Sequence, residues 1–129
     1  MLKLLLALGM TTAAGIGAAR AQDAAAGEKV FGQCRACHQI GPNAKNVIGP
    51  ELNGVIGRKA GTVPGYNYTP ANKNSGLTWD EETFETYIKN PQGVVKGTKM
   101  TFAGIKNDQQ IKDLYAYLKQ FDASGNKAP

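Results

Sequence analysis

Both cysteines of this 129-residue chain lie in one tetrapeptide, Cys34-Arg35-Ala36-Cys37, and the next residue, His38, is the only histidine. A disulfide between these thiols would close a very short loop, which stabilises a fold by only about 2 kcal/mol, against ~4.7 kcal/mol for a loop of 100 residues. A structural crosslink is therefore a poor explanation for the pair. The string places two thiols one helical turn apart with an imidazole beside them, so the fold must be built around whatever these three side chains hold.

Cys-Arg-Ala-Cys-His is the attachment signature for c-type haem. Each thiol can bond one vinyl group of the haem, and the imidazole is then presented to the iron. A thioredoxin-like dithiol needs a strand before the motif, whereas the residues before Cys34 are typical of a helix. A zinc site needs four ligands, and the chain has only two cysteines and one histidine. We therefore predict one covalent haem c, attached through Cys34 and Cys37, with His38 as a ligand of its iron.

The first 21 residues have the three parts of a secretory signal peptide. A short positive start at residues 1–3 is followed by 16 residues without a charge, and Ala19-Arg20-Ala21 has the small-x-small pattern of a cleavage site. The uncharged run is shorter than the ~20 residues that a membrane span needs. We predict a cleaved signal peptide at 1–21, a single domain at 22–129 and a periplasmic location.

Charge and composition narrow the classes of function. The whole chain has a net charge of +5, and removal of residues 1–21 takes away Lys3 and Arg20, which leaves +3. The basic residues are scattered, so the chain lacks the clustered charge of a protein that binds nucleic acid. Its 42% hydrophobic and 19% charged residues are typical of a packed domain. The length leaves room for one such domain and excludes a multidomain enzyme.

Met100 is the strongest candidate for the sixth ligand of the iron. It is the only methionine outside the predicted signal peptide, and it lies in the glycine-punctuated segment 96–104, which is typical of a loop. Without a haem, a lone methionine would be a core residue. Tyrosine is a weaker alternative, because tyrosinate suits catalase-type chemistry. A thioether ligand raises the reduction potential and leaves no open position for a substrate, which indicates an electron carrier.

Three segments are predicted to be helical, and no segment alternates like a strand. Asp23 can cap a helix that runs into the cysteine motif. Thr78–Glu81 has the form of a capping box, which opens a helix that ends near Asn90-Pro91. Asn107 or Asp108 caps a last helix. Its apolar residues follow the i, i+3, i+4, i+7 spacing and are Ile111, Leu114, Tyr115 and Leu118.

A long loop is predicted between Gly41 and Gly76, where turn residues are frequent and no periodic segment occurs. Such a loop is unusual in a compact domain unless it has something to wrap. A covalent macrocycle supplies apolar surface that the polypeptide would otherwise have to provide. The predicted fold is therefore all-α, with three main helices and long loops around a haem.

From about Asp23 to Leu118 the chain resembles the class I cytochromes c, in particular the bacterial cytochrome c2 branch. The matching strings, in chain order, are Cys34–His38, Gly49-Pro50, Gly57–Lys59, Tyr66–Thr69, Ala71–Asn74, Leu77–Trp79, Glu81–Thr83, Tyr87, Asn90-Pro91, Gly97–Met100, Phe102–Gly104, Leu114 and Ala116–Leu118. The resemblance implies a soluble, monomeric electron carrier rather than an enzyme. It would work at the membrane surface, between a quinol–cytochrome c oxidoreductase and a terminal oxidase or a photosynthetic reaction centre.

The resemblance also implies roles for residues around the haem. His38 and Met100 would be the axial ligands, and the carbonyl of Pro50 would accept a hydrogen bond from the imidazole. The residues that would hydrogen-bond a haem propionate are Arg58, Tyr68 and Trp79. Those that would form a polar group beside the Met100 sulfur are Asn72, Tyr87 and Thr98. Plain packing is the alternative role for Trp79 and an equally good explanation for Tyr87. Without a haem, Arg58 would be a solvated surface charge. The resemblance further implies that Gly27, Phe31, Leu114 and Tyr117 join the first and last helices.

Two other classes of function stay open at this point. A haem enzyme, such as a small peroxidase, would need a sixth position that is open or easily opened. Lys96 stands where the family often has a proline before Gly97-Thr98, which predicts a less rigid Met100 loop. A zinc or redox-dithiol module would contain no haem at all.

Overall fold

The computed structural model describes residues 22–128, and the predicted signal peptide lies outside them. The helices are α1 (Ala24–Phe31), α2 (Pro70–Lys73), α3 (Glu81–Lys89), α4 (Pro91–Val94) and α5 (Asp108–Lys119). Within the described residues there is no strand, only the isolated bridges Lys59–Thr78 and Phe121–Lys127. The predicted all-α fold with three main helices is confirmed, and α2 and α4 add one short turn each. None of the described helices has the length and apolar character that crossing a membrane requires.

Two of the predicted helix starts are confirmed by their caps. The Asp23 carboxylate accepts a hydrogen bond from the amide of Ala26 at 3.1 Å at the start of α1. The Asn107 side chain accepts one from the amide of Gln110 at 3.0 Å at the start of α5. Each side chain satisfies an amide that has no partner inside its helix.

The predicted capping box at Thr78–Glu81 is wrong in its first residue. Asp80 is the cap of α3, and its carboxylate accepts a hydrogen bond from a first-turn amide at 2.8 Å. Thr78 pairs instead with Lys59 in an isolated bridge, and the backbone of Trp79 forms two hydrogen bonds with residues 57–58. These bonds hold 78–79 extended, so the helix begins two residues later than a Thr78 cap would place it.

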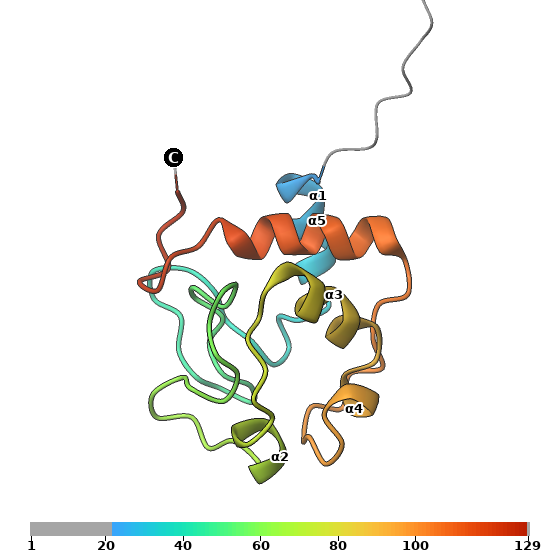
Figure 1. The fold of residues 1–129 in the computed structure, drawn as a ribbon. Helices are drawn as coiled ribbons and strands as arrows, with labels where there is room; N and C mark the ends of the chain where they lie inside the picture. Colours follow the sequence, from blue (N-terminus) through green and yellow to red (C-terminus); the bar gives the residue numbers. More distant parts are fainter. Residues whose placement is uncertain (1–21, 129) are drawn as a thin grey trace, which may run out of the picture.

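Helices α1 and α5 cross at very close range, as Figure 1 shows for the blue and red segments. A Cβ atom on Gly27 would lie 1.9 Å from the carbonyl oxygen of Asp113, so only glycine allows this approach. Next to the crossing, the rings of Phe31 and Tyr117 lie 5.3 Å apart between centroids. The predicted contact between the first and last helices is therefore confirmed.

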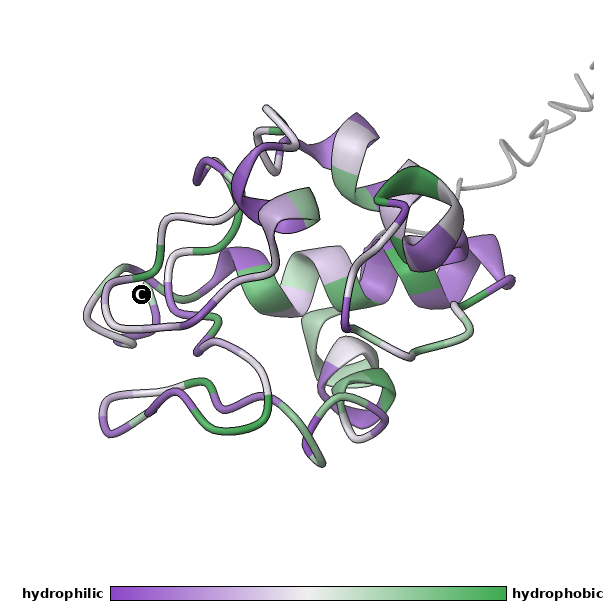
Figure 2. Cartoon of the chain, turned by 90° about the horizontal axis from the view of Figure 1, so that it is seen from below, coloured by the Kyte–Doolittle hydropathy of each residue, from purple (hydrophilic) through white to green (hydrophobic). Residues whose placement is uncertain are grey.

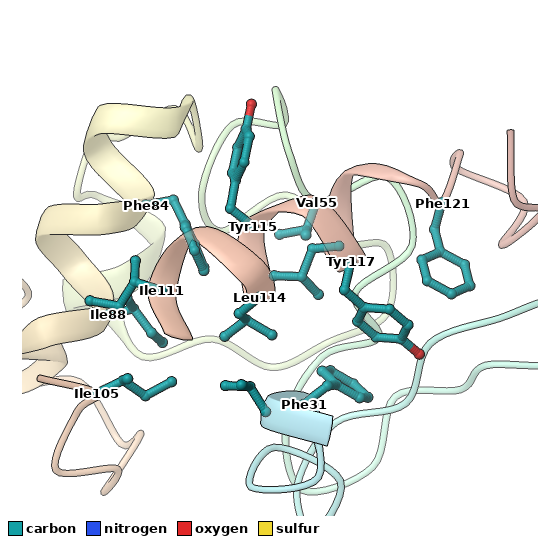
Figure 3. Close-up of a cluster of buried hydrophobic side chains, with 12 residues drawn as sticks. Phe31, Val55, Phe84, Ile88, Ile105, Ile111, Leu114, Tyr115, Tyr117 and Phe121 are labelled. Atoms are coloured by element: carbon teal, nitrogen blue, oxygen red, sulfur yellow. The ribbon is translucent and has the colours of Figure 1, made fainter. Parts of the chain in front are cut away.

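The core extends from this crossing toward α3. Figure 3 shows Leu114 of α5 in the middle of the cluster, between Phe31 of α1 and Phe84 of α3. In Figure 1 the loops of residues 35–68 lie on one flank of the molecule and α3 and α4 lie on the other. Figure 2 shows that hydrophobic positions occur along the loops as well as the helices. Loop residues such as Val55 are buried, so the loops contribute to the interior and do not only connect helices.

The segment between Gly41 and Gly76 is irregular apart from α2, as predicted. A four-residue helix is too short to produce a hydrophobic period, so the sequence pattern could not reveal it. Asn53 is buried, and its side chain bonds both the amide and the carbonyl of Gly41, at 2.8 and 2.9 Å. This internal bridge supplies hydrogen bonds that a helix or sheet would otherwise provide.

Candidate functional site

A cavity of about 440 Å³ lies between the loops and helices α1, α3 and α5. Its size is that of a site for an organic ligand or cofactor. Apolar side chains form much of its wall, including those of Phe31, Leu52, Phe84 and Leu114. All eleven predicted site residues line it; they are Cys34, Cys37, His38, Pro50, Arg58, Tyr68, Asn72, Trp79, Tyr87, Thr98 and Met100. Residues up to 66 positions apart in sequence are thus brought to one site.

The cysteine motif continues the chain from the end of α1 in successive turns. The amide of Cys34 donates to the carbonyl of Phe31 at 2.8 Å, and the amide of His38 donates to the carbonyl of Cys34 at 2.9 Å. Both cysteines are free thiols and both line the cavity. The turns therefore present two thiols and one imidazole to the same space.

The environment of Cys34 favours a thiol over a thiolate. Burial, followed by the neighbouring Cys37, raises the pKa of Cys34 to about 11, although Arg35 opposes the shift. A redox dithiol requires a readily formed thiolate, which is stabilised by a lowered pKa. Within residues 22–128, moreover, no group of three or more His, Cys, Asp or Glu side chains could hold a metal ion. The site therefore does not match a zinc or redox-dithiol module.

His38 is oriented by the backbone that follows the motif. Its Nδ1 atom lies 2.7 Å from the carbonyl oxygen of Pro50, which can only accept, so Nδ1 carries the proton. Burial lowers the pKa of His38, and the bond to Pro50 offsets this only in part. The imidazole is therefore neutral, and its Nε2 lone pair is free to bind a metal.

Gly49, which was not among the predicted site residues, completes this arrangement. A Cβ atom at this position would lie 2.5 Å from Cε1 of His38 and 3.0 Å from the carbonyl oxygen of Cys37. The Gly49 amide also donates to that carbonyl at 2.6 Å. The Gly49-Pro50 string was the available signal, because a glycine beside a functional loop often allows close backbone approach.

Met100 is hydrogen-bonded by two of the three polar residues that were predicted to lie beside its sulfur. The hydroxyl of Tyr87 donates to the Met100 sulfur at 3.1 Å. Burial raises the pKa of Tyr87 to about 12, so this hydroxyl stays protonated at neutral pH. Thr98 Oγ1 accepts a hydrogen bond from the Met100 amide at 3.2 Å. Asn72 lines the same cavity, but its side chain accepts a hydrogen bond from Thr69 at 3.0 Å.

Arg58 lines the cavity, and its guanidinium is bound by groups of the preceding loop. It donates to the carbonyl oxygens of Asn53 and Glu51 at 2.8 and 3.3 Å, and it lies 3.7 Å from the Glu51 carboxylate. Its side chain is only 21% exposed, so it is not a solvated surface charge. Burial lowers the pKa of Arg58, and the nearby Glu51 and Tyr68 oppose that shift. Glu51 and Asn53 could not be predicted from the sequence pattern, because loop geometry alone places them here.

Tyr68 and Trp79 also line the cavity. The Tyr68 hydroxyl accepts a hydrogen bond from the Val63 amide at 3.0 Å, and the Trp79 ring lies 4.6 Å from that of Tyr87 between centroids. The cavity thus combines apolar walls, two thiols, a neutral imidazole, a thioether and a buried cation. This set of groups fits a macrocycle that carries a metal and acidic side groups.

Comparisons with known proteins agree with this fit. A family model described as Cytochrome c matches residues 24–122. The chain is 57% identical over 115 residues to cytochrome c2 of Blastochloris viridis, covering 89% of this chain and 91% of that protein. It is 59% identical over 107 residues to cytochrome c2 of Rhodoblastus acidophilus, covering 83% and 100%. The solved structure of cytochrome c2 from Rhodospirillum centenum gives a TM-score of 0.74 at 44% identity, covering 78% of this chain and 98% of that chain.

Proposed function

Because this chain belongs to the cytochrome c family and is an electron carrier of the cytochrome c2 type, we propose that His38 and Met100 are the two axial ligands through which it works. Its cofactor is haem c, attached at Cys34 and Cys37. The observation that carries the proposal is that both thiols, the imidazole and the thioether line one largely apolar cavity. Bound haem supplies an iron that exchanges one electron between its ferric and ferrous states.

The residues of the chain keep this exchange free of other chemistry. The Pro50 carbonyl fixes the His38 ring and raises its basicity, while the Tyr87 hydroxyl holds the Met100 sulfur in place. The apolar walls exclude water and keep the surroundings similar in both oxidation states. With both axial positions filled, a substrate has no site at which to bind, which is the difference between a carrier and a haem enzyme.

Carbon monoxide binding tests the sixth ligand. The reduced wild-type protein is expected not to bind carbon monoxide at pH 7, whereas Met100→Ala is expected to bind it, with the change followed in the visible spectrum. Thr101→Ala is the matched control, because Thr101 lines the cavity next to Met100 and offers no sulfur. Binding to the wild-type protein at pH 7 would contradict the assignment and favour a haem enzyme with an open position.

We also propose that residues 22–129 form the exported domain, which works in the periplasm after the signal peptide is removed. It would carry electrons from a membrane quinol–cytochrome c oxidoreductase to a terminal oxidase or a photosynthetic reaction centre. The three-part pattern of residues 1–21 and the similarity to proteins named cytochrome c2 support this proposal. Sequencing the N-terminus of the periplasmic protein should give Gln22 first, and oxidase-containing membranes or illuminated reaction centres should oxidise the reduced protein. Retention of residues 1–21 would contradict the proposed export, and failure to react with both the oxidase and the reaction centre would contradict the proposed partners.

A further inference from the structure

Glu51 is a fixed, mostly buried carboxylate that the mechanism above does not use. Its Oε2 atom accepts a hydrogen bond from the Asn53 amide at 2.6 Å, and its own amide donates to the Asn46 side chain at 2.9 Å. The side chain is only 19% exposed. The carboxylate therefore has a defined position, unlike the mobile side chain of a surface glutamate.

The charge of Glu51 acts on the cavity through Arg58. Arg58 lines the cavity, and Glu51 lies behind it, with 3.7 Å between the carboxylate and the guanidinium. Because both side chains are mostly buried, water screens their charges only weakly. The pair Glu28–Arg35 provides a contrast, since its atoms are 3.9 Å apart but both side chains are more than half exposed.

We infer that Glu51 is a positioning residue that lowers the reduction potential of the haem by offsetting the positive charge of Arg58 at the cavity wall. The inference rests on the proposed haem ligation. The ferric state carries one more positive charge than the ferrous state, so a buried carboxylate stabilises the ferric state. Without that carboxylate, the unopposed charge of Arg58 favours the ferrous state.

The test is the midpoint potential of Glu51→Gln at pH 7 and constant ionic strength. Glutamine has the same shape and can still accept the Asn53 hydrogen bond, so only the charge changes. We expect the equilibrium constant for electron exchange with a fixed mediator to change at least threefold in favour of the reduced protein. At 59 mV per tenfold change, this is a rise in the midpoint potential of about 28 mV. Glu51→Ala removes the same charge and should shift the potential in the same direction, while Glu51→Asp should stay nearer the wild-type value.

Glu28→Gln is the matched control, because it removes the same charge from an exposed ion pair. Its shift should be much smaller than that of Glu51→Gln. An unchanged or lowered potential in Glu51→Gln, or an equal shift in Glu28→Gln, would overturn the inference. The sulfur-to-iron charge-transfer band is recorded for each protein. If wild type and Glu51→Gln both keep the band but have the same potential, only the role of Glu51 fails. If wild type lacks the band, the proposed ligation fails.

Discussion

The side chain of each proposed axial ligand makes one hydrogen bond to a neighbour. Nδ1 of His38 donates to the Pro50 carbonyl, and the Met100 sulfur accepts from the Tyr87 hydroxyl. The two bonds have opposite electronic consequences. The carbonyl makes the imidazole a better electron donor, whereas the hydroxyl withdraws electron density from the sulfur and makes it a poorer donor to the ferric iron. At this scale, single polar contacts adjust the reduction potential without changing the fold.

Replacing Tyr87 by phenylalanine should therefore lower the midpoint potential. The sulfur would become a better donor and would stabilise the ferric state. The lost hydrogen bond is worth about 1 kcal/mol, so the midpoint potential should fall by no more than about 40 mV. The measurement is a spectroelectrochemical titration at pH 7. Tyr115→Phe is the control, because Tyr115 is also buried but does not line the cavity; an equal shift in both variants would contradict this explanation.

At the scale of the elements, the crossing of α1 and α5 depends on one missing methyl group. Helix propensity favours alanine over glycine by about 1 kcal/mol at position 27. The 1.9 Å approach to the Asp113 carbonyl opposes this, because the neighbour is backbone and cannot move aside. Whether a substitution by alanine raises or lowers the free energy of unfolding therefore shows whether helix propensity or packing dominates at this position.

We expect Gly27→Ala to destabilise the protein by about 1–3 kcal/mol, since overpacking costs about that much. Gly32→Ala is the control at the end of the same helix, where φ is −49° and the nearest atom, the Lys29 carbonyl oxygen, lies 3.0 Å away. It should change stability little. The free energy of unfolding in urea measures both variants. Increased stability in Gly27→Ala would show that the close crossing is not required.

Carboxylates at the starts of α3 and α5 should make the free energy of unfolding fall at acid pH. Hydrogen bonds from Thr83 lower the pKa of Asp80, and a hydrogen bond and charge from Lys89 lower the pKa of Asp108. A carboxyl whose folded pKa is depressed stabilises the fold above its unfolded value, near pH ~4, and loses that contribution as the pH falls through the folded value.

Asp80→Asn keeps an oxygen at the cap but does not titrate. Its urea midpoint should therefore fall less than that of the wild type between pH 5 and pH 3. Equal losses in the two proteins would mean that Asp80 contributes nothing to the pH dependence.

The motifs that carry chemistry were predictable, because covalent attachment and ligation require fixed residues at fixed spacing, as at Cys34–His38. The α1–α5 contact was predictable from Gly27 and its family pattern. The cap of α3 was not predictable, because Thr78 forms a backbone bridge with Lys59, which lies 19 positions earlier in the chain. Glu51 was missed for the same reason: its pairing with Arg58 depends on the path of the loop between them.

For the whole molecule, the cofactor is part of the core. A site of about 440 Å³ with largely apolar walls exposes those walls to water unless the haem fills it, and the burial of apolar surface is the main driving force of folding. We therefore expect the helices and loops to lose their cooperative packing when no haem is attached.

The variant with both Cys34→Ala and Cys37→Ala, which cannot attach haem, should lack a cooperative thermal transition in near-ultraviolet circular dichroism. Arg35→Ala is the control, since it changes the same motif but keeps both thiols. A sharp transition in the double variant, in the absence of haem, would show that the polypeptide forms its core alone.

The near-infrared spectrum of the oxidised wild-type protein tests the central claim most directly, because a sulfur-to-iron charge-transfer band reports methionine ligation. We predict that wild type shows this band at pH 7 and that Met100→Ala lacks it. A wild-type spectrum without the band, or a Met100→Ala spectrum identical to that of the wild type, would contradict the assignment of His38 and Met100 as the ligands of a closed, electron-carrying site.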